Sequence, residues 1–292
     1  MDDTIIHIAN LMMRSDVLLI AAGAGMGVDA GISDYYRGIE IAHPRLASLG
    51  LNLYQLSSHD LFLKNPALAW GHWITRQRDY LQKLPHKGYY LIRAWSQLKK
   101  FNVRIITTNL DRHFLRVGFS KDQVFEMHGS MYDAQCLRKC GRTPWTLNVD
   151  CLPSVDEQTM LVSDPLLPSC IGCGGPARVC TSLAMDGHWD APDVELARVR
   201  HEIFFHTLPW THTVTVLELG CGTVMNKLRK EAERIVLEHR SRGGRAIHVR
   251  INLFESVMDQ DEDNISIPMG ALETLQQIHT SLKKLQSLSN HE

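Results

Sequence analysis

The sequence predicts an α/β protein built on a mainly parallel sheet. Short apolar segments that end at glycine or polar residues, such as residues 17–22, alternate along the chain with longer segments of helical periodicity. Continuously apolar strands are typical of sheets covered on both faces, and alternation with helices is typical of parallel order. We therefore expect a mainly parallel α/β sheet with its strand ends available for a ligand.

Composition limits the classes of function. The 292 residues are 44% hydrophobic and 22% charged, which is ordinary for a globular protein with a sizeable core. A formal net charge of -1 is not typical of proteins that bind polyanions, so we expect no direct nucleic-acid binding. No apolar run reaches the roughly 18–20 residues of a membrane span, and the acidic N-terminus lacks the pattern of a signal peptide. We expect no membrane association.

The first half of the chain predicts helices around two strands and a short third one. Residues 3–14 have a helical apolar stripe, and residues 17–22 form the first strand. Residues 40–100 are mostly helical, with Pro66 suited to the first turn of one helix. Further strands are expected at 102–109 and 123–129.

The second half changes character and then returns to strand and helix. Residues 136–180 are rich in cysteine, proline and glycine and have little periodicity. A strand at 213–220 leads into a helix at 226–244, and a strand at 245–252 precedes a closing helix at 269–286.

Glycines follow the first strand at Gly23 and Gly25. Glycine lets backbone approach a pyrophosphate closely, and a helix start beyond it offers free N–H groups. The match to G-x-G-x-x-G is partial because Val28 occupies the sixth place. A tight strand-to-helix turn without a ligand is an equal alternative.

Three other strand ends are polar or rich in glycine. Asn109 and Asp111 follow the second strand, where they face a ligand or cap a helix. His128 follows the third strand and suits proton transfer near neutral pH, although a lone histidine is more often structural. The segment 220–222 also ends a strand, and a packing role alone is an even alternative.

Four cysteines form two close pairs, Cys136 with Cys140 and Cys170 with Cys173. Thiolates at such spacing converge on tetrahedral zinc, and four protein ligands leave no position for a catalytic water. We therefore expect a structural zinc site.

The other three cysteines are isolated. Cys151 and Cys180 are weaker candidates for a zinc ligand, and Cys221 is expected to pack as a small apolar side chain. An odd cysteine count with two close pairs suits a metal and a reducing compartment better than disulfides, so we expect a cytoplasmic protein.

Taken in order, the motifs resemble those of sirtuins, NAD-dependent protein deacylases, of a bacterial-type branch. The resemblance runs from about Asp16 to the closing ISIPMGALETL, and it rests on GAGMGVDAGISDYYRG, TTNLD, EMHG, CLRKC with CIGCGG, ELGCG and RIN. It implies one catalytic domain, with NAD in a cleft of the fold. The Rossmann-like part would comprise 1–40, 101–135 and 181–292, the helical lobe 41–100 and the inserted zinc module 136–180.

The resemblance also implies a reaction. An acylated lysine of a protein substrate would attack the ribose of NAD, nicotinamide would leave, and the acyl group would move to ADP-ribose. His128 would be the general base, while Asn109 and Asp111 would hold the nicotinamide ribose and its pocket. The remaining residues that the resemblance assigns to NAD are Gly23, Ala24, Gly25, Asp34, Tyr35, Arg37, Thr108, Gly220, Cys221, Gly222 and Asn252.

Departures from the family pattern keep other functions open. The usual G-I-P-D-F-R is GISDYYR here, and Thr108 stands where many sirtuins have glutamine. Ala184 and Met185 replace a Phe-Gly pair that clamps the acyl-lysine peptide. TTNLDRHFLRVGF also resembles macrodomain-linked sirtuins, which transfer ADP-ribose to protein but lack the histidine. A mono-ADP-ribosyltransferase, an NAD glycohydrolase and an NAD-sensing module without turnover are the alternatives, and a hydride-transferring dehydrogenase is a remote one.

Overall fold

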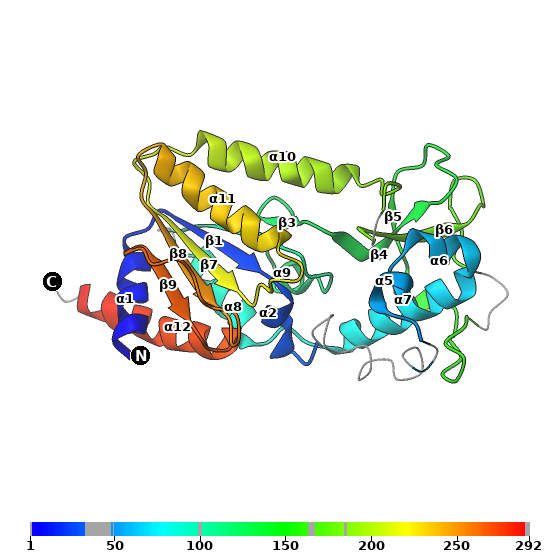
Figure 1. Cartoon of the computed structure of the whole chain (residues 1–292), viewed down its shortest axis with the longest axis horizontal. Coiled ribbons are helices and arrows are strands. Elements are labelled where there is room, and N and C mark those ends of the chain that lie inside the picture. The colour runs from blue at the N-terminus through cyan, green and yellow to red at the C-terminus, as the bar shows by residue number, and fades with distance from the viewer. Residues whose placement is uncertain are drawn as a thin grey trace. The chain divides into compact units, whose positions relative to one another are not determined.

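The computed structural model describes residues 2–32, 48, 50–98, 101–162, 167–183 and 186–289. The chain divides into two compact units (Figure 1). We call Met1–Gly31, Leu84–Met127 and Ala197–Glu292 the sheet unit, and Ile32–Lys83 and His128–Leu196 the cysteine unit.

The sheet unit contains a six-stranded parallel sheet in the order β3-β2-β1-β7-β8-β9. This confirms the predicted α/β class. The strands are β1 (Val17–Ala22), β2 (Asn102–Thr107), β3 (Val124–Glu126), β7 (Val214–Leu219), β8 (Ala246–Ile251) and β9 (Asn264–Ile267).

Helices cover both faces of this sheet, as the apolar strands require. Figure 1 shows α11 (Lys227–Ser241) on one face, with α1 (Asp2–Met13) and α12 (Ala271–Ser289) on the other. Alternate residues of β1, Leu18 and Ile20, belong to the same buried core as residues of α1, α12 and α8 (Lys87–Ser96). The opposite face of β7 and β8 is therefore the face that α11 covers.

The predicted helical stripes are buried as expected. In α1, Ile5, Ile8, Ala9 and Met12 are buried, and in α11 the buried apolar residues are Leu228, Ala232, Ile235 and Val236. The unit is completed by α2 (Ala24–Val28), α9 (His113–Arg116) and most of α10 (Pro192–Thr207), which crosses from one unit to the other along the chain.

In its described part, the cysteine unit combines helices with a small antiparallel sheet. Pro66 begins α7 (Pro66–Gln82), and the Asn65 side chain caps this helix by accepting a hydrogen bond from the Leu68 N–H. The sheet has the order β5-β4-β6. The other elements are α5 (Leu53–Leu56), α6 (His59–Lys64), β4 (Gly129–Cys136), β5 (Trp145–Thr146), the 3-10 turn η1 (Val149–Cys151) and β6 (Ala177–Thr181).

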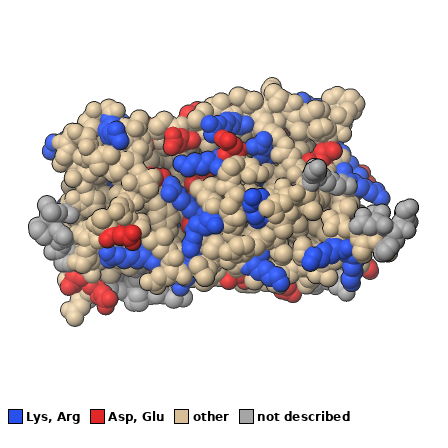
Figure 2. All heavy atoms as spheres, turned by 180° about the vertical axis from the view of Figure 1, so that it is seen from behind, with Lys and Arg blue, Asp and Glu red and all other residues tan. Residues whose placement is uncertain are grey.

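Surface charge is mixed. On the face drawn in Figure 2, acidic side chains lie among the basic ones, which agrees with the near-zero net charge. Among the helices that the structure describes, none is long and apolar enough to cross a bilayer.

Candidate functional site

Glycines join the loop after β1 to the loop after β7. The Gly25 N–H donates to the carbonyl oxygen of Gly220 at 3.0 Å, and the Gly23 N–H donates to that of Leu219 at 2.9 Å. A Cβ on Gly23 would lie 2.6 Å from the Gly220 oxygen, and one on Gly220 would lie 2.5 Å from the Gly25 Cα. Because two backbones meet at van der Waals contact, side chains are excluded from both. Close packing thus explains the glycines at these positions, and the N–H groups of Gly23 and Gly25 already form hydrogen bonds within the protein.

Asn109 ties the loop after β2 to the same place. Its Nδ2 donates to the Gly23 carbonyl oxygen at 2.9 Å, and its backbone N–H donates to the Thr107 hydroxyl at 3.0 Å. That hydroxyl donates to the Ala22 oxygen at 2.7 Å, and the Thr108 N–H reaches the same oxygen at 3.4 Å. The carboxyl ends of β1 and β2 are therefore held together by the side chains that end β2.

Asp111 hydrogen-bonds to the start of a short helix, although Arg112 and not Asp111 occupies its N-cap position. The Asp111 side chain is buried, and Oδ1 accepts a hydrogen bond from the N–H of His113, the first residue of α9, at 2.8 Å. Burial, and then the Asp111 charge, raise the pKa of Tyr89 well above its usual value. The phenol therefore stays protonated beside the carboxylate.

Asn252 joins the loop after β8 to the loop after β7. Its Nδ2 donates to the Cys221 carbonyl oxygen at 2.9 Å, and its Oδ1 accepts the N–H groups of Phe254 and Glu255, each at 3.0 Å. The Glu255 carboxylate also contacts the loop after β7: it accepts hydrogen bonds from the Thr223 N–H at 2.9 Å and from the Thr223 hydroxyl at 2.8 Å. The two loops are connected at two points.

Cys221 is buried, as expected for a packing residue. Its Sγ lies 3.4 Å from the Ala21 carbonyl oxygen. Burial raises the pKa of this thiol well above its usual value, so it stays neutral. Its neighbour Gly222 is exposed and faces the Glu255 carboxylate.

The structure thus brings together most of the predicted NAD residues at one edge of the sheet. Four loops follow β1, β2, β7 and β8, and hydrogen bonds link each to at least one other. Open parallel sheets bind ligands at this edge. Asp34, Tyr35 and Arg37 lie outside the described residues.

His128 begins the second segment of the cysteine unit and lies two residues after the end of β3. Its carbonyl oxygen accepts the Thr181 hydroxyl at 2.6 Å and the Ser182 N–H at 2.9 Å. Gly129 has φ 72°. A Cβ on Gly129 would lie 2.7 Å from the Cys180 carbonyl oxygen, so close packing explains why a glycine follows His128.

The four predicted zinc cysteines converge. Their Sγ atoms all lie within 4.8 Å of one another, with Cys136 and Cys173 at 3.7 Å and Cys140 and Cys170 at 3.6 Å. A tetrahedron with Zn–S bonds of about 2.3 Å has sulfur–sulfur edges of about 3.8 Å. The sulfur positions therefore fit a zinc ion.

Backbone geometry prepares Cys170 as a thiolate. The N–H of Gly172 points at its Sγ at 3.4 Å. Desolvation acts against the charge, but hydrogen bonds from the N–H groups of Cys173 and Gly172 and from the neighbouring cysteine side chains lower the pKa of Cys170 to about 6. A thiolate is the form that binds metal.

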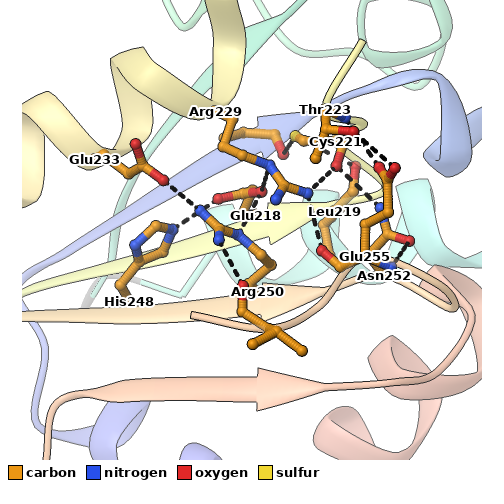
Figure 3. A network of polar contacts seen from close by, with 12 residues as sticks. Glu218, Leu219, Cys221, Thr223, Arg229, Glu233, His248, Arg250, Asn252 and Glu255 are labelled. Atoms are coloured by element: carbon orange, nitrogen blue, oxygen red, sulfur yellow. Dashed lines mark hydrogen bonds and ion pairs between the residues drawn. The ribbon is translucent and has the colours of Figure 1, made fainter. Parts of the chain in front are cut away.

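Sequence reasoning missed a buried charged network beside these loops (Figure 3). Glu218 on β7 is fully buried, and it contacts His248 and Arg250 on β8 and Arg229 on α11. The available signal was an acid and a base within two apolar strands, Glu218 in TVTVLELG and Arg250 in RAIHVRIN.

Comparison with known proteins decides the family. The sequence pattern that defines the Sir2 family matches residues 23–202, more than half of the chain. The chain belongs to the Sir2 family. A relative in Mycobacterium tuberculosis named NAD-dependent protein deacylase is 30% identical over 159 residues, which are 54% of this chain and 60% of the relative. This Sir2 protein thus matches only part of that relative's length.

Other relatives broaden the comparison. A Fusarium oxysporum protein named probable bifunctional ADP-ribose hydrolase/ADP-ribosyltransferase is 25% identical over 87% of this chain and 44% of its own length. A solved Sir2 homologue in complex with NAD has a TM-score of 0.68 at 19% identity, covering 96% of this chain and 94% of the homologue. That structural likeness establishes the Sir2 fold.

Proposed function

We propose that this Sir2 protein is an NAD-dependent protein-lysine deacylase. The observation that carries the proposal is the set of four linked loops at the carboxyl ends of β1, β2, β7 and β8, which is where open α/β sheets bind dinucleotides. Family membership and the mycobacterial deacylase support the same activity.

NAD would lie along these loops. The turn formed by Gly23, Ala24 and Gly25 would take the pyrophosphate, and its close packing against Gly220 excludes side chains at Gly23 and Gly25. Asn252 would bind the adenosine ribose. The segment Gly220, Cys221 and Gly222 would line the adenine side.

The nicotinamide half would lie toward the end of β2. Asn109 and Asp111 would hold the ribose and its pocket, beside Thr108. Their internal hydrogen bonds to Gly23 and His113 support this role because they fix both side chains before a ligand arrives. Asp34, Tyr35 and Arg37 would close over the nicotinamide.

The reaction balances with water. The amide oxygen of the acyl-lysine attacks the ribose C1′, the bond from C1′ to the nicotinamide nitrogen breaks, and nicotinamide leaves. His128 takes a proton from a ribose hydroxyl, whose oxygen then attacks the amide carbon. The C–N bond of the former amide then breaks, and the proton passes to the leaving lysine amine. Water adds to the acyl carbon, the bond from that carbon to the C1′ oxygen breaks, and the products are free lysine and acyl-ADP-ribose. A positioned base typically contributes about 10²–10⁴-fold to such a step.

Zinc would be held by Cys136, Cys140, Cys170 and Cys173 and would stabilise the fold of residues 136–180. A site closed by four thiolates has no position for a reacting water. We further propose a Rossmann-like part in the sheet unit, and a helical lobe and a zinc module in the cysteine unit. A cytoplasmic location is supported by the seven cysteines, because all lie within the described residues and none forms a disulfide.

A second candidate is protein mono-ADP-ribosyl transfer. The fungal relative, whose name includes ADP-ribosyltransferase, matches 87% of this chain. In that reaction a nucleophilic side chain of the target protein replaces the amide oxygen at C1′, and nicotinamide leaves as before. The retained His128 favours deacylation, because the acyl transfer uses the base.

A product-resolved mass-spectrometric assay tests the proposal. The protein is incubated with NAD and peptides that carry acetyl, longer acyl or lipoyl groups on lysine. Deacylation predicts equal amounts of nicotinamide, free-lysine peptide and acyl-ADP-ribose from at least one peptide. Release of nicotinamide together with ADP-ribosylated protein would instead show transferase activity. Release of nicotinamide with free ADP-ribose alone would show glycohydrolase activity, and either result would overturn this proposal.

A further inference from the structure

The charged network beside the loops is built around one carboxylate. Glu218 is 0% exposed, and its Oε1 lies 2.9 Å from Arg250 Nε and 3.4 Å from Arg229 Nε, while Oε2 lies 2.9 Å from His248 Nε2. Strand register brings these groups together, because Glu218 pairs with Arg250 and Val216 with His248. All of them lie on the sheet face that α11 covers.

Arg229 and Arg250 also donate hydrogen bonds to backbone carbonyl groups in the loops beyond the sheet. Arg229 Nη2 donates to the Cys221 carbonyl oxygen at 2.6 Å and to that of Glu255 at 2.9 Å. Arg250 Nη1 donates to the Val257 oxygen at 3.1 Å. Figure 3 shows the Arg229 guanidinium between Glu218 on one side and the backbone of the two loops on the other.

Arg229 therefore connects the loop after β7 with the loop after β8. The Cys221 carbonyl oxygen accepts hydrogen bonds from both Arg229 and Nδ2 of Asn252. Glu255 accepts a hydrogen bond from Arg229 through its carbonyl oxygen and donates its own N–H to Oδ1 of Asn252. The orientation of the Asn252 amide depends on both of these backbone positions. The guanidinium thus adds a further link between the backbone segments that orient Asn252.

We propose that Arg229, with Glu218 as its buried counter-ion, is a positioning residue that fixes these two loops for the adenosine half of NAD. The inference rests on the proposed NAD binding. Buried ionic groups contribute little net stability compared with apolar packing of the same volume, because desolvation offsets their attraction. The value of this network lies in the geometry that a planar guanidinium imposes through several fixed donors.

Arg229→Lys separates geometry from charge. A lysine keeps the positive charge beside Glu218, but its single ammonium group does not reproduce the planar fork of donors. Arg234→Lys is the matched control on the same helix, because Arg234 pairs with Glu231 and Glu238 at the surface. The probe is ADP-ribose, titrated by calorimetry into wild type and both variants.

The inference predicts an ADP-ribose dissociation constant about tenfold or more higher for Arg229→Lys, and unchanged for Arg234→Lys. The KM for NAD would rise similarly while kcat stays within about twofold, because the lost binding is common to ground and transition states. Amide hydrogen exchange at Thr223, Phe254 and Glu255 would be faster in Arg229→Lys alone, a readout that needs no activity.

Wild-type binding separates the two possible failures. Wild type that binds no ADP-ribose would overturn the proposed function and this inference with it. Wild type that binds, with Arg229→Lys equal to it in affinity or in exchange at the three amides, would overturn the inference only. If Arg229→Lys does not fold, Arg229→Met is measured in its place. It should show the same loss of ADP-ribose affinity, and wild-type affinity or wild-type exchange at the three amides would again overturn the inference.

Discussion

The backbone of Gly25 lies directly against that of Gly220, with the Gly25 N–H bonded to the Gly220 oxygen at 3.0 Å. Gly220 also has φ 61°, a region that L side chains rarely adopt. Two separate requirements, conformation and space, therefore exclude any other residue at position 220. The contact joins the strand ends that would hold the pyrophosphate and the adenine.

Gly220→Ala is expected to destabilise the protein by about 2–4 kcal/mol and to weaken ADP-ribose binding, because the new methyl group meets backbone that has no room to move. Urea unfolding and calorimetry measure the two effects. Gly243→Ala is the control, since Gly243 also has positive φ (83°) but a Cβ there meets nothing within 4 Å. It should cost only about 1 kcal/mol and leave binding intact. Equal effects of the two variants would refute the packing argument.

Elemental analysis should find about one zinc per chain, as a closed four-thiolate site implies. Cys170→Ala should lose the metal, and chelation of wild type should unfold the cysteine unit first, because metal binding and folding are coupled. Cys151→Ala is the matched control, since Cys151 is exposed and does not belong to the four-cysteine cluster. A stably folded wild-type protein without metal, or retention of zinc by Cys170→Ala, would contradict the site.

The α/β class and the central strands were predictable because both depend on local patterns. Buried strands such as 17–22 are apolar along their whole length, and the stripes of α1 and α11 repeat at helical spacing. By contrast, helix α10 was not predicted, because its sequence has no clear apolar stripe. In the structure its only buried residues are His201 and Phe205. The four-residue strand β9 was too short to signal its pairing with β8.

The candidate site was predictable where one residue carries the signal, and not where partners come from several elements. Glycine, asparagine and cysteine motifs located the four loops and the metal cluster. The Glu218 network depends on the register between β7 and β8 and on the turn of α11 that presents Arg229. No local pattern encodes that combination.

His128→Ala is expected to reduce deacylation by about 10²–10⁴-fold while ADP-ribose still binds, because the variant lacks the base but keeps the loops. The measurement combines the product assay with calorimetry. His206→Ala is the control, an exposed histidine on α10 that pairs with Glu238. If His128→Ala matches wild type in every NAD-dependent product, the catalytic role is wrong.

Glu231 gives the fold a pH dependence. Burial acts to raise its pKa, but hydrogen bonds from Arg234 and His201 prevail and lower it to about 2, from the usual 4.5. The ionised carboxylate therefore stabilises the folded state fully above about pH 4.5, and this contribution is lost as the pH falls toward 2.

Urea unfolding of wild type and Glu231→Gln checks this dependence. Wild type should be more stable by about 1 kcal/mol at pH 6.5, a value reduced by solvent screening of the partly exposed pair, and the difference should narrow by pH 3.5. Glu273→Gln, on the exposed side of α12, should unfold with wild type at both pH values. A difference between wild type and Glu231→Gln that does not change with pH would exclude the linkage.

A crystal structure of this Sir2 protein with ADP-ribose tests the central claim most directly. The account predicts density for the pyrophosphate over Gly23–Gly25 and for the adenosine between Gly220–Gly222 and Asn252. Well-defined ligand density at any other place on the chain, with these loops empty, would contradict it.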